Sequence, residues 1–126
     1  MGLLGSLGLI SLALAGLSGW LVLAATEKPD WFRERGVPAP RRFLQLHLDW
    51  VMMGLILLAV ELAVPARPAA VTAALAFGLI VNPLLFLPLA WGPEIKRRLV
   101  YKAITVASFT ATSLGLTALA VWAILL

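Results

Sequence analysis

Residues 43–91 read FLQLHLDWVMMGLILLAVELAVPARPAAVTAALAFGLIVNPLLFLPLAW, two apolar runs separated by the tetrapeptide at 65–68. Each run has roughly the 20 residues that an α-helix needs to cross a hydrocarbon core about 30 Å thick. A connection of this length makes the two helices antiparallel neighbours, and Pro68 suits the first turn of the second helix. The stretch therefore predicts a membrane-spanning helical hairpin.

Two further apolar runs flank this hairpin, so we expect four helices at about 3–25, 43–64, 69–91 and 103–126. They predict an all-α integral membrane protein, a four-helix antiparallel bundle that forms a single transmembrane domain. The composition agrees, because 62% of the 126 residues are hydrophobic and only 13% are charged. Soluble domains average about 45–50% apolar and about 25% charged residues, so a water-soluble domain is excluded.

The basic residues give the expected orientation. The net charge is +4, and all but Arg67 of the 10 Lys and Arg residues lie in or beside loop one (26–42) and loop three (92–102). By the positive-inside rule both loops are cytoplasmic, which places loop two (65–68) and both termini outside. We therefore expect the bacterial inner membrane as the location, the lipid bilayer as a partner and no nucleic acid. The aromatic residues expected at the membrane surfaces are Trp91, Tyr101 and Trp122.

Few polar side chains interrupt the apolar runs. Cysteine is absent, and His47 is the single histidine. An ionisable side chain at the centre of a membrane costs at least about 2.5–3.5 kcal/mol, so each one needs a reason. In the second run Asp49 accompanies His47 and is expected to pair with Arg42 or to orient a neighbouring subunit. Glu61, close to the outer end, is expected to extend to the membrane surface.

His47, Trp50 and Gly54 fall on one stripe of the second helix, and that stripe must face protein or a cofactor. A histidine above a glycine gap suits a flat macrocycle, because iron takes the imidazole nitrogen and the missing side chain lets the ring approach the backbone. These three residues are therefore the candidate cofactor-binding residues, with His47 as the metal ligand. The alternative is that His47 only hydrogen-bonds a neighbouring backbone group or a lipid headgroup.

The third run contains Asn82-Pro83, where the proline removes a backbone donor and is expected to bend the helix. Ala74, Gly78, Asn82 and Phe86 recur every four residues and form a groove that suits either close helix packing or a pocket. Hydroxyl groups of the fourth run are expected to bond carbonyls one turn back. They belong to Thr105, Ser108, Thr110, Thr112, Ser113 and Thr117.

The segment HLDWVMMG at 47–54 resembles the second transmembrane helix of the hydroxylaminobenzene mutase and styrene oxide isomerase family, which are small four-helix membrane isomerases. His47 and Gly54 keep the spacing of that family, and the similarity extends to Val37-Pro38 and Asn82. The resemblance implies a haem b held between the subunits of a homotrimer, with His47 as axial ligand. It further implies Asn82 as a catalytic residue and a ferric iron that acts as a Lewis acid on an epoxide or N-hydroxy oxygen of a small aromatic substrate.

Three positions depart from the pattern of that family. Met53 stands where the family has asparagine, Phe86 where styrene oxide isomerases have tyrosine, and Gly78 where we expect an acidic residue. These losses remove polar contacts to an oxygen substrate, so the resemblance argues more strongly for the haem site than for isomerase activity. The alternatives are a non-enzymatic membrane haem protein, a small transporter and an accessory membrane subunit. A transporter of the small multidrug type would be expected to carry a carboxylate in its first helix, where this chain has no charge.

Overall fold

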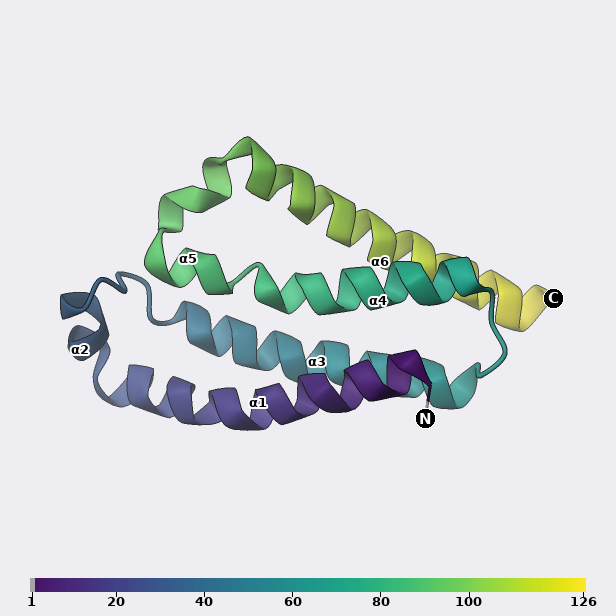
Figure 1. The fold of residues 1–126 in the computed structure, drawn as a ribbon, viewed down its shortest axis with the longest axis horizontal. Coiled ribbons are helices and arrows are strands. Elements are labelled where there is room, and N and C mark those ends of the chain that lie inside the picture. Colours follow the sequence, from purple (N-terminus) through teal and green to yellow (C-terminus); the bar gives the residue numbers. More distant parts are fainter. Residues whose placement is uncertain (1) are drawn as a thin grey trace.

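The computed structural model describes residues 2–126, and this range is α-helical without a strand. Four long antiparallel helices form the molecule, and three short helices occupy the connections (Figure 1). Four segments are long and apolar enough to cross a membrane, which confirms the expected fold class. The long helices are α1 (Leu3–Glu27), α3 (Arg42–Ala63), α4 (Ala69–Leu84) and α6 (Leu99–Leu125), and the short ones are α2 (Pro29–Glu34), α5 (Leu87–Trp91) and the 3-10 helix η1 (Pro93–Arg97).

The third membrane segment is broken, as Asn82-Pro83 predicted, although the break lies slightly beyond that pair. Helix α4 ends at Leu84, and the segment resumes as α5. Pro83 and Pro88 both lack the N–H that would continue the helical ladder, so the backbone between them loses two hydrogen bonds. The last helix begins at Leu99 rather than at 103, because the long side chain of Lys102 can reach the membrane surface from within a helix.

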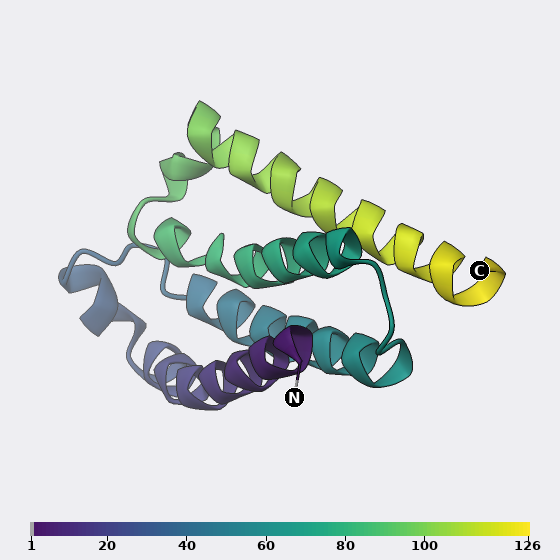
Figure 2. The same ribbon diagram turned by 45° about the vertical axis from the view of Figure 1, so that its right-hand side comes forward.

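The bundle is open on one side. Helix α3 packs against α1 and α4, and α6 packs along α4 (Figure 2). Within residues 2–126, α6 makes no close backbone contact with α1 or α3. It lies beside α4 at the C-terminal end and diverges from it toward loop three (Figure 1). This divergence leaves room for a cavity at the loop-three end.

Glycines allow the close approach of two helix pairs, α1 with α3 and α4 with α6. A Cβ on Gly8 would lie 2.9 Å from the carbonyl oxygen of Gly54, so α1 and α3 meet backbone to backbone. A Cβ on Gly78 would lie 2.9 Å from the backbone nitrogen of Thr112 on α6. The expectation that Gly54 leaves a gap for a macrocycle is therefore wrong, and of the two alternatives for the groove at Gly78 the structure shows close helix packing. Both glycines are consumed by helix packing inside the chain.

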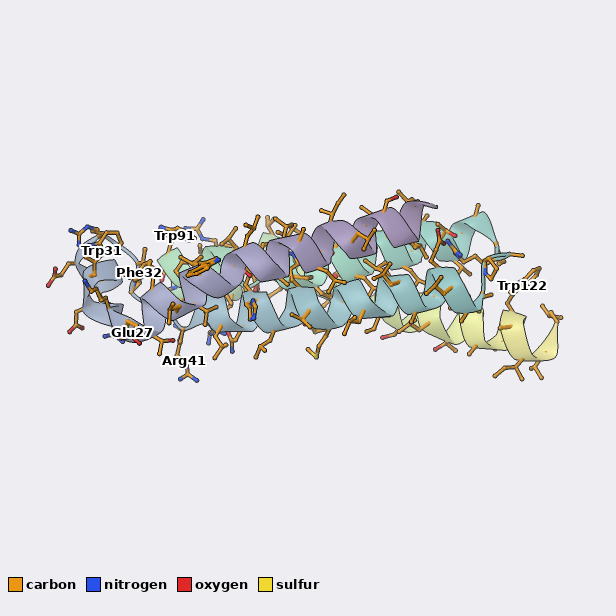
Figure 3. All side chains as sticks on the ribbon, turned by 90° about the horizontal axis from the view of Figure 1, so that it is seen from below. Glu27, Trp31, Phe32, Arg41, Trp91 and Trp122 are labelled. Atoms are coloured by element: carbon orange, nitrogen blue, oxygen red, sulfur yellow. The ribbon has the colours of Figure 1, made fainter. Side chains whose placement is uncertain are left out.

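Loop one folds back onto the bundle. Phe43 stacks edge-to-face between Phe32 of α2 and Trp91 of α5, with ring centroids 5.7 Å away in each case. The backbone N–H of Ala39 donates to the carbonyl of Ala90 over 3.1 Å. Figure 3 shows the labelled Phe32 and Trp91 gathered at this end of the molecule. Loop one is therefore anchored to the end of the third segment.

The opposite end is closed by polar contacts. Arg67 of loop two donates to the carboxylate of Glu61 over 2.6 Å, and the same carboxylate accepts from the amides of Gly2 and Gly5 at the start of α1. A cation and a helix N-terminus thus bind Glu61 within the protein, and its position relative to the membrane surface stays a prediction. The indole of Trp122 donates to the carbonyl of Ala66 over 3.0 Å, which ties α6 to loop two.

Candidate functional site

His47 lies half-buried between α3 and α1, about one and a half turns from the start of α3. Its Nδ1 is 2.7 Å from the carbonyl oxygen of Ala15 and 3.1 Å from the hydroxyl of Ser18, which itself donates to Ala15. A carbonyl can only accept, so the proton of a neutral imidazole must sit on Nδ1. The lone pair is then on Nε2, which has no hydrogen-bond partner among residues 2–126.

This arrangement is the one that metal-binding histidines usually show, with one ring nitrogen bonded to a carbonyl and the other available. Gly19 of α1 adds room beside the ring, because a Cβ built there would meet only the imidazole, with Cε1 at 3.5 Å. The glycine that borders His47 is therefore on α1. Gly54 of α3, which the sequence suggested for this part, is covered by α1.

A basic cavity lies one helical turn from His47 toward loop one. It has a volume of about 250 Å³, and its lining includes the apolar Val22 and Leu44 and the basic Arg33 and Arg41. Arg33 pairs with an exposed carboxylate 3.0 Å away, whereas Arg41 has no ion pair in the part of the chain that the structure describes. Figure 3 shows Arg41 extending away from the helices. The cavity suits an anionic group at the membrane surface.

Trp50 lies one turn beyond His47 on α3 and is half-buried. The stripe of His47, Trp50 and Gly54 was expected to face protein or a cofactor. The structure shows that α1 covers it at Gly54, whereas at His47 one ring nitrogen remains free. Contact of Trp50 with a cofactor stays a prediction.

Asn82 belongs to a polar network between α4 and α6. Its amide oxygen accepts from Ser108, whose hydroxyl is also 3.1 Å from the carbonyl of Gly78. Its amide nitrogen donates to Thr112 over 3.4 Å, and the Thr112 hydroxyl donates to the carbonyl of Ser108 over 2.9 Å. Asn82 thus holds two helices together, and one amide hydrogen and one lone pair of its amide oxygen are left for a ligand.

Asn82 also lines the cavity that opens where α6 diverges from α4. The cavity has a volume of about 280 Å³ and lies between α3, α4 and α6. Asp49 is among its lining residues, and the pairing expected with Arg42 is absent; that guanidinium donates to Gln45 over 2.7 Å. The lining residues are Asp49, Met53, Asn82, Leu85, Phe86, Tyr101, Thr105 and Phe109.

The structure does not bring all predicted site residues together. His47 contacts α1, while Asn82 contacts α6, so the two lie on opposite sides of the α3–α4 hairpin. Met53 and Phe86, which replace polar residues in the resemblance, do meet in the cavity beside Asn82. The chain therefore has two separate candidate sites, a histidine site and a carboxylate cavity.

The sequence did not predict a role in these sites for several of their residues. Gly8, Ser11, Ala15 and Ser18 are all buried on α1 and recur at spacings of three and four, which is the signal of a helix that packs closely. That pattern could have indicated the face that meets α3, but not the bond to His47. Tyr101 of the cavity was assigned to the membrane surface, and its spacing gives no signal of the cavity.

Comparison with known proteins leaves the family open: no family model, no curated protein and no solved structure matches this chain. Within residues 2–126, no three His, Asp or Glu side chains converge as a potential metal site. A haem iron needs only one axial protein ligand, so His47 remains sufficient for that group.

Proposed function

We propose that this chain is a small membrane haem b protein whose axial ligand is His47, and that it acts as an isomerase on epoxides or N-hydroxy aromatics. The observation that carries the proposal is the hydrogen bond of Nδ1 to Ala15, which leaves Nε2 with a lone pair and no partner among the described residues. Ferric haem would supply a Lewis acid for the substrate oxygen. The chain's own part is to fix the ring tautomer and orientation through Ala15 and Ser18.

Arg33 and Arg41 would bind the propionate carboxylates. Their cavity lies one turn from His47 along the same α1–α3 pair, so a ligand could contact the imidazole and the guanidinium groups together. Arginine suits this role, because its planar guanidinium binds carboxylates in bidentate fashion. Val22 and Leu44 of the cavity lining would contact the apolar edge of the macrocycle.

The proposal requires a homo-oligomer, and the resemblance favours a trimer. His47 and Asn82 lie on opposite sides of the α3–α4 hairpin, so both can reach one haem only if the histidine of one subunit faces the Asn82 cavity of the next. In that arrangement Asn82 would donate its remaining amide hydrogen to a small aromatic substrate. Native mass spectrometry in mild detergent should show a haem-loaded trimer, and a haem-loaded monomer would refute this part.

The haem proposal is tested by absorbance of the protein purified from haem-replete cells. We expect a Soret band that is lost in His47→Ala, while the variant stays folded with a stability cost of about 1–3 kcal/mol. Titration with haem dimethyl ester, which lacks free propionates, should give weaker binding than haem, and Arg41→Gln should reduce that difference. An unchanged Soret band in His47→Ala would exclude His47 as the ligand.

We also propose the bacterial inner membrane, with loops one and three in the cytoplasm. The support is the concentration of Lys and Arg in these loops. A cysteine at Gly36 should react with an impermeant reagent only from the cytoplasmic side, and one at Ala66 only from the outside. The reverse pattern would overturn the orientation.

A non-enzymatic membrane haem protein is the second candidate. The observation that favours it is the engagement of Asn82 with Ser108 and Thr112, combined with apolar Met53 and Phe86 at the cavity. Such a cavity offers little hydrogen bonding to a developing oxyanion. The test is to incubate haem-loaded protein with styrene oxide and with phenylhydroxylamine. If neither compound is converted, the result supports the non-enzymatic haem protein.

A further inference from the structure

We propose that the cavity between α3, α4 and α6 binds a protonated amine that carries a single aromatic ring. The ammonium group would lie beside Asp49, and the ring among Met53, Phe86 and Phe109. This inference concerns the cavity that the proposed function assigns to an aromatic substrate, but it adds a different ligand and does not depend on haem at His47. The volume of the cavity, about 280 Å³, lies at the lower end of the volumes of small-molecule sites, which suits a ligand with one ring.

Asp49 provides the charge. It lies about two turns into α3, is half-buried, and has no ion pair among residues 2–126. Arg42, two turns earlier on the same face, donates to Gln45 instead. A lone carboxylate inside a membrane segment is expensive, and membrane carboxylates are usually paired with a cation or placed on a ligand path. A cationic ligand would supply the missing partner.

Two other polar residues of the cavity, Tyr101 and Thr105, also offer acceptors, whereas Asn82 keeps one amide hydrogen. The hydroxyl of Tyr101 donates its hydrogen to the carbonyl of Leu85 over 2.7 Å, and that of Thr105 donates to the carbonyl of Tyr101 over 2.9 Å. Each hydroxyl has one hydrogen, so both oxygens have only lone pairs left for a ligand. Together with the Asp49 carboxylate they form a set of acceptors, which favours an ammonium donor over an anion.

The apolar wall completes the site. Phe86 and Phe109 contribute aromatic rings and Met53 a thioether, all of which line the same cavity as Asp49. Aromatic faces attract cations by about 0.5–2 kcal/mol, and thioethers pack favourably against aromatic rings. The site therefore distinguishes a benzylammonium ion from an alkylammonium ion through its ring, and from benzyl alcohol through its charge.

The test compares benzylamine, which is protonated at pH 7, with benzyl alcohol by isothermal titration calorimetry of the whole chain in nanodiscs. Wild type should bind the amine at least about tenfold more tightly than the alcohol, as expected for a hydrogen bond to a charged group. Asp49→Asn should remove this preference and leave alcohol binding unchanged. Asp30→Asn, which alters an exposed carboxylate outside the membrane segments, is the matched control and should preserve it.

Two further variants keep the outcome unambiguous. Tyr101→Phe removes one acceptor and should weaken amine binding several-fold without changing alcohol binding, which tests the site even if Asp49→Asn does not fold. Gly16→Leu changes a position on α1 where a Cβ meets no atom within 4 Å, and it should bind the amine as wild type does. Equal affinity of wild type for amine and alcohol, or a preference for the amine that persists in Asp49→Asn, would overturn the inference, whereas a missing Soret band would contradict the haem proposal alone.

Discussion

The α1–α3 and α4–α6 interfaces differ in what they do with polar groups. Both bring backbones together at a glycine, Gly54 in the first and Gly78 in the second. In the first, the described residues leave Nε2 of His47 and the buried hydroxyl of Ser11 without a partner. In the second, Ser108 lies within hydrogen-bond distance of two acceptors. Close packing is thus common to both interfaces, whereas polar groups without a hydrogen-bond partner occur mainly in the α1–α3 interface.

This difference separates structural polar residues from candidate functional ones. A polar group whose hydrogen bonds are all made inside the protein contributes to helix association and has little left for a ligand. A polar group that is fixed on one side and free on the other is oriented for binding. His47 belongs to the second kind, whereas Asn82 belongs mostly to the first.

The largest effect is expected from Gly78→Leu in the α4–α6 pair. The new side chain would meet the backbone of Thr112 at 2.9 Å and of Ser108 at 3.0 Å, neither of which can move away easily. Because α4 is the only long helix that α6 packs along, α6 would lose its main support. We expect a loss of about 3 kcal/mol, the upper end of overpacking penalties. Unfolding in detergent measures the loss, and an unchanged midpoint would contradict the close approach.

Gly54→Leu should destabilise the α1–α3 pair somewhat less, by about 2 kcal/mol. Its Cβ would meet the carbonyl oxygen of Gly8 at 3.0 Å, but α1 also contacts α4, so the helix keeps part of its support. Gly16→Leu is the matched control on α1, because a Cβ there has no atom within 4 Å. The control should be as stable as wild type or slightly more stable. Equal losses in both variants would mean that Gly54 is not a packing contact.

Ser108→Ala should cost about 0.5–1.5 kcal/mol, the range of hydrogen bonds between membrane helices. The variant leaves the Asn82 amide oxygen and the Gly78 carbonyl without their common donor. The same detergent unfolding assay gives the value. Retention of full stability would show that the network is not a source of α4–α6 association.

Ser11→Ala should have the smallest effect and the opposite sign. The Ser11 side chain is 1% exposed, and its hydroxyl has no partner in the described part of the chain, so alanine removes an unsatisfied group. We expect a gain of about 0.5 kcal/mol. A loss of stability would show that the hydroxyl makes a bond in the membrane, and would weaken the contrast between the two interfaces.

Much of the fold could be predicted because a membrane imposes few solutions. The runs at 43–64 and 69–91 predicted the α3–α4 hairpin, and Pro83 predicted a break in the third segment, which falls just after this proline. The candidate sites were harder to predict from the sequence. A sequence shows that His47 is the single histidine, but the acceptor of its Nδ1 proton lies 32 residues away on another helix. The rotation of each helix about its axis decides such contacts, and periodicity constrains it only loosely.

By itself the sequence determined the number, length and order of the membrane helices, because hydrophobic length and connection length are local properties. It also limited any histidine ligand to His47. Only the tertiary structure decided that Gly54 faces Gly8, that Nε2 of His47 is the free nitrogen, and that Asp49 shares a cavity with Tyr101. These facts depend on which helix faces meet and where α6 diverges, and packing between distant segments sets both.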